Sequence, residues 1–274
     1  MLPARRPSYL SLLLCVIFSA AFAQTTPYKG GSGQFKKLVW SDEFNYNGLP
    51  DNSKWDYEKG YARNKELQYY TVARNENATV TNGYLTITAK NDSLAAGSKV
   101  YPITSASLTT KGKKDWTYGR NEVRAKIPSS LGTWPAIWML GTDIKSEGWP
   151  AAGEIDILEH VGFAPDTVHF NVHTAKYNHV KKTNRGVPIP YPAPHNNFHV
   201  YGIEWFKDHI DWYMDDNKVF TFNNEGEGAA SWPFDKPQYL ILNLAFGGAW
   251  GGARGADLSS LPQKFLVDYV RVYQ

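Results

Sequence analysis

The chain has 274 residues, of which 29 are basic, 26 are acidic and 15% are aromatic. A charge this close to balance provides no strongly basic surface, so the composition disfavours nucleic acids and other polyanions as partners. The single cysteine, Cys15, lies near the N-terminus. The rest of the chain therefore forms no disulfide and must be stabilised by one large hydrophobic core.

The N-terminal residues have the pattern of a secretory signal peptide. Arg5 and Arg6 precede an uncharged apolar run that ends in Ala21-Phe22-Ala23, and this run is shorter than the about 20 residues that a membrane-spanning helix needs. We therefore predict a signal peptide over residues 1–23, cleaved after Ala23. The mature protein is expected to be secreted, extracellular or periplasmic, without membrane contact. Residues 24–35 are polar and rich in glycine, which predicts a flexible lead-in.

The remaining residues, 36–274, have the pattern of an all-β domain. Asn82-Gly83 separates two alternating runs, 78–81 and 84–89, and this arrangement is a strong signal for a β-hairpin. Similar runs occur at residues 210–214, 219–222, 239–245 and 265–273. No long helical period interrupts them. We predict one monomeric domain folded as a two-sheet antiparallel sandwich or jelly roll, with a barrel as the weaker alternative.

Three acidic residues lie close together in the segment 153–160. Because strand side chains alternate, Glu154 and Asp156 share one face, and the isoleucines between them point to the other. Glu159 falls on the core face of a regular strand, where an unpaired carboxylate is costly. A β-bulge at residues 157–158 would return Glu159 to the face of the other two acids, and bulges are frequent beside active sites.

Such a bulge would bring the carboxyl groups of Glu154 and Glu159 within about 5 Å if the side chains lean inward, the separation typical of a retaining glycosidase. Three acids on one face repel each other, so at least one holds its proton at neutral pH. We predict that ionised Glu154 is the nucleophile, that protonated Glu159 is the acid/base, and that Asp156 tunes both. The residues alone leave two alternatives open, a solvated strand face and a calcium site.

The segment 154–159 resembles the signature of glycoside hydrolase family 16, in its bulged form. Further motifs resemble the laminarinase-like, endo-β-1,3-glucanase branch: Trp40-Ser-Asp-Glu-Phe44, Asn64-Lys-Glu-Leu-Gln-Tyr-Tyr70, Gly132-Thr-Trp-Pro-Ala-Ile-Trp-Met-Leu140, Trp149-Pro150 and Val267-Asp-Tyr-Val-Arg-Val-Tyr273. The resemblance implies a concanavalin A-like jelly roll with an open cleft on its concave sheet. It also implies retaining hydrolysis of internal β-1,3 bonds in laminarin-type glucans, with mixed β-1,3/1,4 glucans as further substrates. The same three acids are the implied catalytic residues, and no cofactor is implied for catalysis.

Six residues are candidates for sugar contacts: Asn64, Trp134, Trp138, Asn171, His173 and Trp250. The first two tryptophans are four residues apart in an extended run and can share a face, although core packing is the alternative. The third lies among glycines that offer few apolar neighbours, which predicts an exposed ring. Asn171 and His173 alternate with apolar residues in a strand that we expect beside the acids. Asn64 resembles a glucan contact of the branch, as does Glu66, for which a structural hydrogen bond is the alternative.

The resemblance has two further consequences. It implies a structural Ca²⁺ held by Glu43, the carbonyl of Gly83 and Asp268, since oxygen ligands suit that ion. One residue departs from the family pattern, because relatives often carry an arginine where Ser107 stands. This departure affects one substrate contact and the fine specificity.

Two other functions stay open. The bulged motif also occurs in algal-galactan branches, so agar or carrageenan are alternative substrates, although a sulfated chain would require a basic cleft. A non-catalytic glucan-binding sandwich is the second alternative. Relatives of that kind keep the fold and lose the acids, so the presence of all three acids favours an enzyme.

Overall fold

The computed structural model describes residues 31–274. The predicted signal peptide and residues 24–30 of the predicted lead-in lie outside the described residues. Within residues 31–274, no helix is both long enough and apolar enough to span a bilayer.

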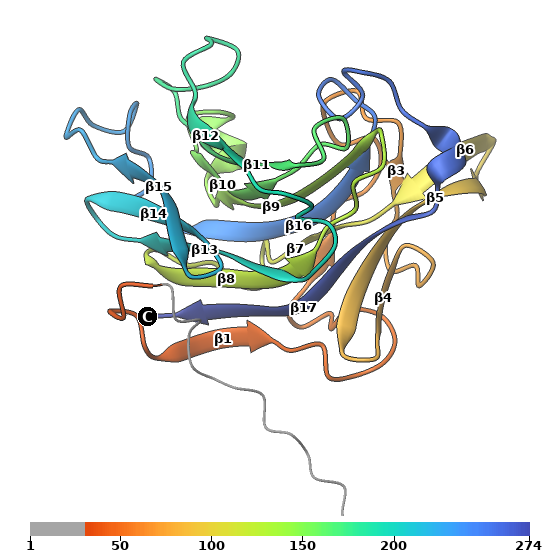
Figure 1. Cartoon of the computed structure of the whole chain (residues 1–274), viewed down its shortest axis with the longest axis horizontal. Coiled ribbons are helices and arrows are strands. Elements are labelled where there is room, and N and C mark those ends of the chain that lie inside the picture. Colours follow the sequence, from red (N-terminus) through yellow and green to blue (C-terminus); the bar gives the residue numbers. More distant parts are fainter. Residues whose placement is uncertain (1–30) are drawn as a thin grey trace, which may run out of the picture.

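Two β-sheets packed face to face form the described part of the chain, and this confirms the predicted sandwich (Figure 1). The pairing is antiparallel except between β3 and β6. The larger sheet has the order β15 (Asn217–Asn223), β14 (His209–Met214), β13 (His199–Trp205), β8 (Gly119–Lys126), β17 (Gln263–Tyr273), β5 (Tyr84–Ala96), β6 (Lys99–Ser105) and β3 (Tyr69–Tyr70), with β1 (Leu38–Asp42) on β17 and β4 (Ala78–Thr81) on β5.

The smaller sheet supplies the concave face of the molecule. Its order is β12 (Arg185–Pro190), β11 (Thr167–His173), β10 (Glu154–Glu159), β9 (Thr133–Gly141), β16 (Gln238–Phe246), β7 (Ser107–Thr109) and β2 (Asp56–Tyr57). Two single helical turns complete the elements of the described residues, α1 (Ile144–Glu147) and η1 (Leu258–Ser260).

The predicted hairpins are present. Asn82 and Gly83 join β4 to β5 with φ angles of 54° and 79°, and two consecutive positive φ values are typical of the turn that suits a two-residue hairpin. The second predicted hairpin is formed by β14 and β15. Its turn is two residues shorter than the sequence suggested, because β15 begins at Asn217 and not at Val219.

The hydrophobic core lies between the sheets and fixes the register of the strands. Ile155 and Ile157 of β10 and Phe170 of β11 are buried in one cluster with Val123 of β8 and Trp212 of β14. Since the side-chain period of a strand is two residues, a slip by one residue would expose the whole apolar set. Burial of one face therefore fixes which side chains the smaller sheet presents to solvent.

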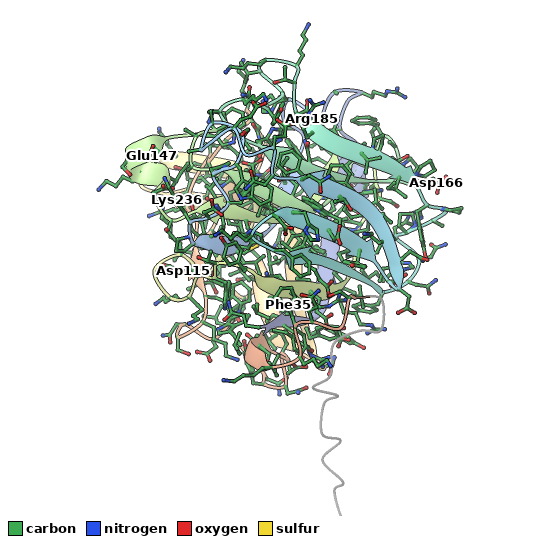
Figure 2. The ribbon with its side chains drawn as sticks, turned by 90° about the vertical axis from the view of Figure 1, so that its left-hand side faces the viewer. Phe35, Asp115, Glu147, Asp166, Arg185 and Lys236 are labelled. Atoms are coloured by element: carbon green, nitrogen blue, oxygen red, sulfur yellow. The ribbon has the colours of Figure 1, made fainter. Side chains whose placement is uncertain are left out.

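The described end of the predicted lead-in, residues 31–35, contacts the larger sheet, and its flexibility stays a prediction. The backbone N–H of Ser32 donates to both carboxylate oxygens of Glu204, at 3.0 and 2.9 Å. The ring of Phe35, labelled in the lower half of Figure 2, lies 5.0 Å from that of Phe206. A buried carboxylate therefore binds the backbone of this segment.

Candidate active site

A cleft of about 810 Å³ lies on the face of the smaller sheet that points away from the core. Its lining comes from β9, β10, β11, β12 and β16, from the segment before β3, from the β9–β10 and β11–β12 connections and from the loop after β16. All residues predicted to be catalytic or to contact sugar line this cleft: Asn64, Trp134, Trp138, Glu154, Asp156, Glu159, Asn171, His173 and Trp250. The sequence-based predictions therefore converge on one surface.

The predicted bulge in β10 is present and places the acids together. Asp156 is paired with Asn171 and Glu159 with His169, so three steps along β10 match two along β11. The two residues inside the bulge, 157 and 158, are both fully buried in the core. The extra residue returns Glu159 to the cleft, because it restores the parity that alternation had broken.

The other sheet stabilises the bulged strand from below. The indole Nε1 of Trp212, in β14, donates to the backbone carbonyl of Asp156 at 2.8 Å. A bulge interrupts the hydrogen-bond ladder, and a buried carbonyl without a partner is costly. Trp212 satisfies this carbonyl and ties the position of the acids to the core.

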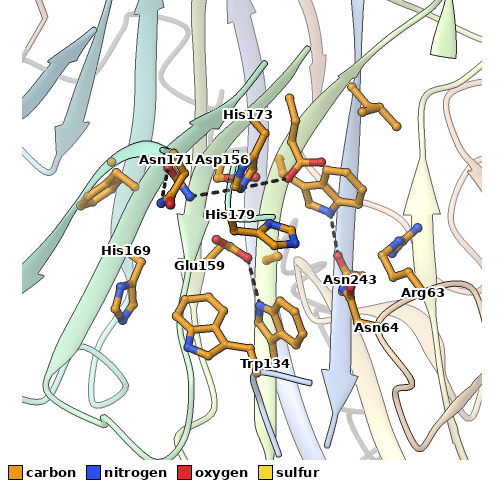
Figure 3. Close-up of a pocket in the computed structure, with 18 of the residues that line it drawn as sticks. Arg63, Asn64, Trp134, Asp156, Glu159, His169, Asn171, His173, His179 and Asn243 are labelled. Carbon is orange, nitrogen blue, oxygen red and sulfur yellow. Dashed lines mark hydrogen bonds and ion pairs between the residues drawn. The ribbon is translucent and has the colours of Figure 1, made fainter. Parts of the chain in front are cut away.

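Each glutamate accepts a hydrogen bond from a tryptophan of the cleft. Trp134 Nε1 donates to Glu159 Oε1 at 3.1 Å, as Figure 3 shows, and Trp149 Nε1 donates to Glu154 Oε2 at 2.9 Å. An indole N–H can only donate, so each bond favours the ionised carboxylate and holds one of its oxygens in place. The two carboxyl groups are thus oriented independently.

Burial is the largest cause of the raised pKa values of all three acids. It raises the pKa of Glu154 to about 7, although the bond from Trp149 and the charge of Arg63 act against it. Burial and the charge of Glu154 raise the pKa of Glu159 to about 8. Burial and the charges of both glutamates raise the pKa of Asp156 well above its ordinary value. Glu154 therefore loses its proton before Glu159 as the pH rises.

His173 faces this acidic group without neutralising it. Its Nε2 lies 3.7 Å from Glu154 and 3.6 Å from Asp156, and Asn171 Nδ2 lies 3.1 Å from the same nitrogen. Burial lowers the pKa of His173 to about 4, so the ring is neutral at pH 7 and can accept from Asn171. One ligand atom each from Glu154, Asp156 and His173 lies within 4.8 Å of the others. This donor set could hold a divalent ion.

The three predicted tryptophans line the cleft in different ways. Trp138 is only 8% exposed and donates through Nε1 to Asn243 Oδ1 at 2.8 Å, so it forms part of the cleft floor. Trp250 is half-buried, and its ring meets those of Trp134 and His169 edge-on at 5.4 and 4.8 Å. The expectation that Trp250 has few neighbours was wrong, because its glycine-rich loop folds back on β9.

The segment before β3 also lines the cleft, through Arg63, Asn64 and Glu66. Asn64 and Gln68 donate to the buried carboxyl group of Glu66 at 3.3 and 2.7 Å. The backbone carbonyl of Asn64 accepts from the N–H of Ala249 at 2.8 Å. Glu66 therefore has both the structural hydrogen bonds considered from the sequence and a place in the cleft lining.

Several lining residues were not predicted to be in the site. They are Arg63, Trp149, His169, His179 and Asn243. Trp149 belongs to one of the recognised motifs, yet its loop has no periodicity that would show the direction of the ring. Asn243 lies in β16, where every residue is buried, so alternation does not distinguish its two faces. His179 is exposed and follows β11 by six residues, and no sequence signal indicates its position.

Ser107, which stands where relatives often carry arginine, is buried beneath the cleft. Its hydroxyl donates to Glu58 Oε2 at 2.5 Å, and both oxygens of Glu58 accept from Arg63. The guanidinium carbon of Arg63 lies 4.9 Å from the centre of the Trp138 ring. An arginine therefore does enter this cleft, from residue 63.

The residues of the expected calcium site do not fit a cation in the arrangement observed. Strand register brings Glu43, Gly83 and Asp268 to neighbouring positions around β17. However, Arg271 donates to both carboxylate oxygens of Glu43, at 2.9 and 2.8 Å, and Arg124 is paired with Asp268. The calcium site stays a prediction, for which the test is a loss of thermal stability on chelation.

The geometry meets the two requirements of glycosidic bond cleavage. One carboxylate must attack or activate water, and one carboxylic acid must protonate the leaving oxygen. Glu154 and Glu159 face the same cleft, and the pKa of Glu154 is the lower of the two. Aromatic rings that suit sugar faces surround both. The fold and the site together define a glycoside hydrolase with an open polysaccharide cleft.

Comparisons with known proteins agree with the class of glycoside hydrolase. The family described as glycosyl hydrolases family 16 matches residues 65–271. A beta-glucanase of Rhodothermus marinus is 52% identical over 248 residues, which cover 87% of this chain and 85% of the relative. The crystal structure of the laminarinase from Rhodothermus marinus is similar with a TM-score of 0.83 at 52% identity, over 87% of this chain and 97% of that one.

A more distant relative has the same region within a longer protein. Glucan endo-1,3-beta-glucosidase A1 of Niallia circulans is 38% identical over 261 residues, which cover 86% of this chain but only 38% of that protein. On these matches, the chain belongs to glycosyl hydrolases family 16, in its laminarinase-like branch.

Proposed function

We propose that this protein is a secreted, retaining endo-glycosidase that hydrolyses internal β-1,3 bonds of laminarin-type glucans, and also mixed β-1,3/1,4 glucans. The observation that carries the proposal is the bulge in β10, which puts Glu154 and Glu159 on one face with separate indole partners and separate pKa values. The names of the relatives, a beta-glucanase and a glucan endo-1,3-beta-glucosidase, support the substrate.

The reaction proceeds by two displacements. Glu154 attacks the anomeric carbon while Glu159 gives its proton to the departing glycosidic oxygen, which leaves a glycosyl ester on Glu154. Glu159, now ionised, takes a proton from water, and that water displaces Glu154 at the same carbon. Two displacements at the same carbon retain its configuration. The raised pKa of Asp156 reduces the negative charge beside Glu154.

The charges of the cleft support a neutral polysaccharide over a sulfated one. Among the described residues that line it, Arg63 is the one lysine or arginine, against the four carboxyl groups of Glu66, Glu154, Asp156 and Glu159. Arg63 is itself paired with Glu58. Sulfate groups would meet no free positive charge here, which makes carrageenan the weaker alternative.

Secretion is proposed from the N-terminal pattern alone. The basic pair, the apolar run and the small-residue ending at Ala23 support export through a cleaved signal peptide. N-terminal sequencing of the protein recovered from culture medium tests this. A mature chain that begins at Gln24 supports the proposal, and an uncleaved chain retained in the cells contradicts it.

The function is tested by reducing-end release from laminarin, lichenan, agarose and carrageenan. The wild type is compared with Glu154→Gln and with Glu204→Gln, a buried glutamate of the larger sheet outside the cleft. We expect release from laminarin that only Glu154→Gln abolishes. Release from a galactan alone would change the substrate and keep the mechanism. Binding without release from any polymer would favour a non-catalytic sandwich.

A further inference from the structure

Arg63 has a fixed place in the cleft for which the two-carboxylate mechanism gives no role. It comes from a tight turn in which Asn64 and Lys65 have positive φ angles of 55° and 54°. The turn is tied to neighbouring loops by bridges between Gly60 and Tyr70 and between Glu66 and Gly247. Residues other than glycine adopt such angles at a cost. These bridges therefore hold the turn, and with it the backbone of Arg63, in a defined position beside the cleft.

Two side chains, Glu58 and Trp138, contact the guanidinium of Arg63. Glu58 accepts from it through both oxygens. Glu58 is in turn bound to β7 twice, by its backbone N–H to the carbonyl of Ser107 at 3.0 Å and by the Ser107 hydroxyl at 2.5 Å. Both bonds come from one nitrogen, Nη2, and a charge-assisted contact of this kind is stronger than a neutral hydrogen bond. The anchoring leaves the guanidinium carbon over the Trp138 ring, 4.9 Å from its centre.

The Trp138 ring has two contacts that fix its position, one with Asn243 and one with Arg63. Its edge is bonded to Asn243, which in turn donates to the hydroxyl of Tyr70 at 3.0 Å, and its face lies 4.9 Å from the Arg63 guanidinium carbon. In the sheet, Trp138 is the direct neighbour of Asp156. A displaced Trp138 ring would therefore alter the cleft floor next to the catalytic acids.

The charge of Arg63 also acts on the catalytic acids. The titratable groups facing Glu154 are Asp156 and Glu159 from β10, His173 from β11, His179 from the following loop, Tyr239 from β16 and Arg63. Burial keeps His173 neutral at pH 7. Arg63 is thus the permanently positive member of this group, and its charge favours an ionised Glu154.

We propose that Arg63 is a positioning residue with two actions: it braces the Trp138 ring against bound glucan, and it provides the positive charge that favours the nucleophilic form of Glu154. The Glu58–Ser107 pair is the anchor of Arg63. Ser107 then contributes to substrate binding indirectly, by holding an arginine that comes from another segment.

The experiment compares pH profiles of kcat/KM, and KM itself, for Arg63→Gln, Arg63→Lys and Lys65→Gln on soluble laminarin. Lys65 is the matched control, because it is exposed in the same turn and does not line the cleft. In Arg63→Gln, we expect the acid limb of the kcat/KM profile, which reports the pKa of Glu154, to move up by about one pH unit. The reason is that an opposite charge nearby lowers a carboxyl pKa by about that amount. We also expect KM to rise several-fold.

Arg63→Lys separates the two actions. A lysine keeps the charge but has no planar guanidinium to lie over the Trp138 ring, so the acid limb of the kcat/KM profile should stay in place while KM rises. Lys65→Gln should change neither quantity. An acid limb that does not move in Arg63→Gln overturns the electrostatic action. An equal shift in Lys65→Gln also overturns it, because the pH of the limb would then depend on the overall charge of the protein.

The melting curve of Arg63→Gln shows whether this variant folds. If it does not fold, a second variant provides the test. Ser107→Ala removes the hydroxyl bond to the Glu58 carboxylate and keeps the arginine, so KM should rise with no movement of the limb, as in Arg63→Lys. A normal KM in both variants overturns the bracing action. The inference rests on the proposed hydrolysis. A wild type that is inactive on every glucan overturns the function itself, whereas an active enzyme with unchanged variants overturns only the role of Arg63.

Discussion

Two groups of buried acids lie on opposite faces of this sandwich, and they differ in their counter-charges. On the outer face of the larger sheet, Arg120 pairs with Glu122 at 2.8 Å and with Glu204 at 3.4 Å, and all three are at most 1% exposed. Tyr213 and the backbone of Ser32 complete the hydrogen bonds of Glu204. In the cleft, three acids crowd one strand, and Arg63 forms its ion pair with Glu58, so that it acts on Glu154 through its charge alone.

The difference shows how one fold uses the same side chain for two purposes. A buried acid with its own arginine and hydrogen bonds forms an ion pair that joins strands. A buried acid without one keeps its proton to a higher pH, and in the cleft this moves the pKa of Glu154 and Glu159 to about 7 and about 8. These values lie near neutrality, where general acid catalysis is most effective.

The cleft acids and the acids paired with Arg120 would not differ in role if removal of a cleft acid left the activity unchanged, or if removal of a paired acid abolished it. Glu154→Gln leaves no nucleophile, so we expect kcat to fall by at least about 10³-fold. Glu204→Gln should keep the activity of each folded molecule, because Glu204 lies on the other sheet. Initial rates on laminarin, normalised to folded protein by circular dichroism, check both variants. Equal losses of activity would remove the distinction.

The converse change removes a counter-charge from the paired group. Arg120→Met leaves Glu122 and Glu204 buried without their arginine, and the expected loss is about 3–5 kcal/mol in the free energy of unfolding. The measurement is urea denaturation at pH 7. Lys207→Met, on a surface turn beside β13, is the control and should cost little. A stable Arg120→Met would show that the ion pairs do not hold the sheet together.

The cleft acids should make stability depend on pH in a defined direction. Because the folded pKa of Glu159 is raised to about 8 from an ordinary 4.5, the folded state binds the proton more tightly, and stability falls as the pH rises through this interval. Glu159→Gln removes this loss, so its melting temperature should exceed that of the wild type by several degrees at pH 9. At pH 4, where Glu159 is protonated in both folded and unfolded states, the two should melt alike. An advantage of Glu159→Gln that is equal at both pH values would contradict the raised pKa.

A smaller effect tests the indole bond to the nucleophile. Trp149→Phe keeps a ring in the cleft and removes the donor to Glu154, so the pKa of Glu154 should rise further, and the acid limb of kcat/KM should move up by less than about one unit. Tyr118→Phe, which removes a hydrogen bond to Asp235 away from the cleft, is the matched control. A limb that stays in place would show that the bond does not tune Glu154.

The parts of this molecule that follow simple periodicity were predictable from the sequence. The hairpin at Asn82-Gly83 and the bulge in β10 both follow from alternation, the latter because Glu159 would otherwise be buried beside Ile157. The acids and the six candidates for sugar contacts were placed on one surface by strand alternation and by the family motifs. Where alternation holds and one face is buried, side-chain direction follows from position.

The rest depends on contacts between distant segments, which leave no periodic signal. Arg63 is placed by a turn with positive φ angles and by a carboxylate anchored on β7. Trp250 seemed unprotected among its glycines, yet Trp134 and His169 pack against it. The docking of residues 31–35 depends on Glu204, far along the chain. Only the folded structure shows these pairings.

Whether catalysis requires an ionised Glu154 and a protonated Glu159 is measured by the pH dependence of kcat/KM for the wild type and Glu159→Gln. We expect a bell-shaped wild-type profile with an acid limb near pH 7 and a basic limb near pH 8. In Glu159→Gln the residual activity should keep an acid limb and lose the basic limb, because only Glu159 must hold its proton. A basic limb that survives in Glu159→Gln, or a wild-type acid limb near the ordinary glutamate pKa, would contradict this assignment.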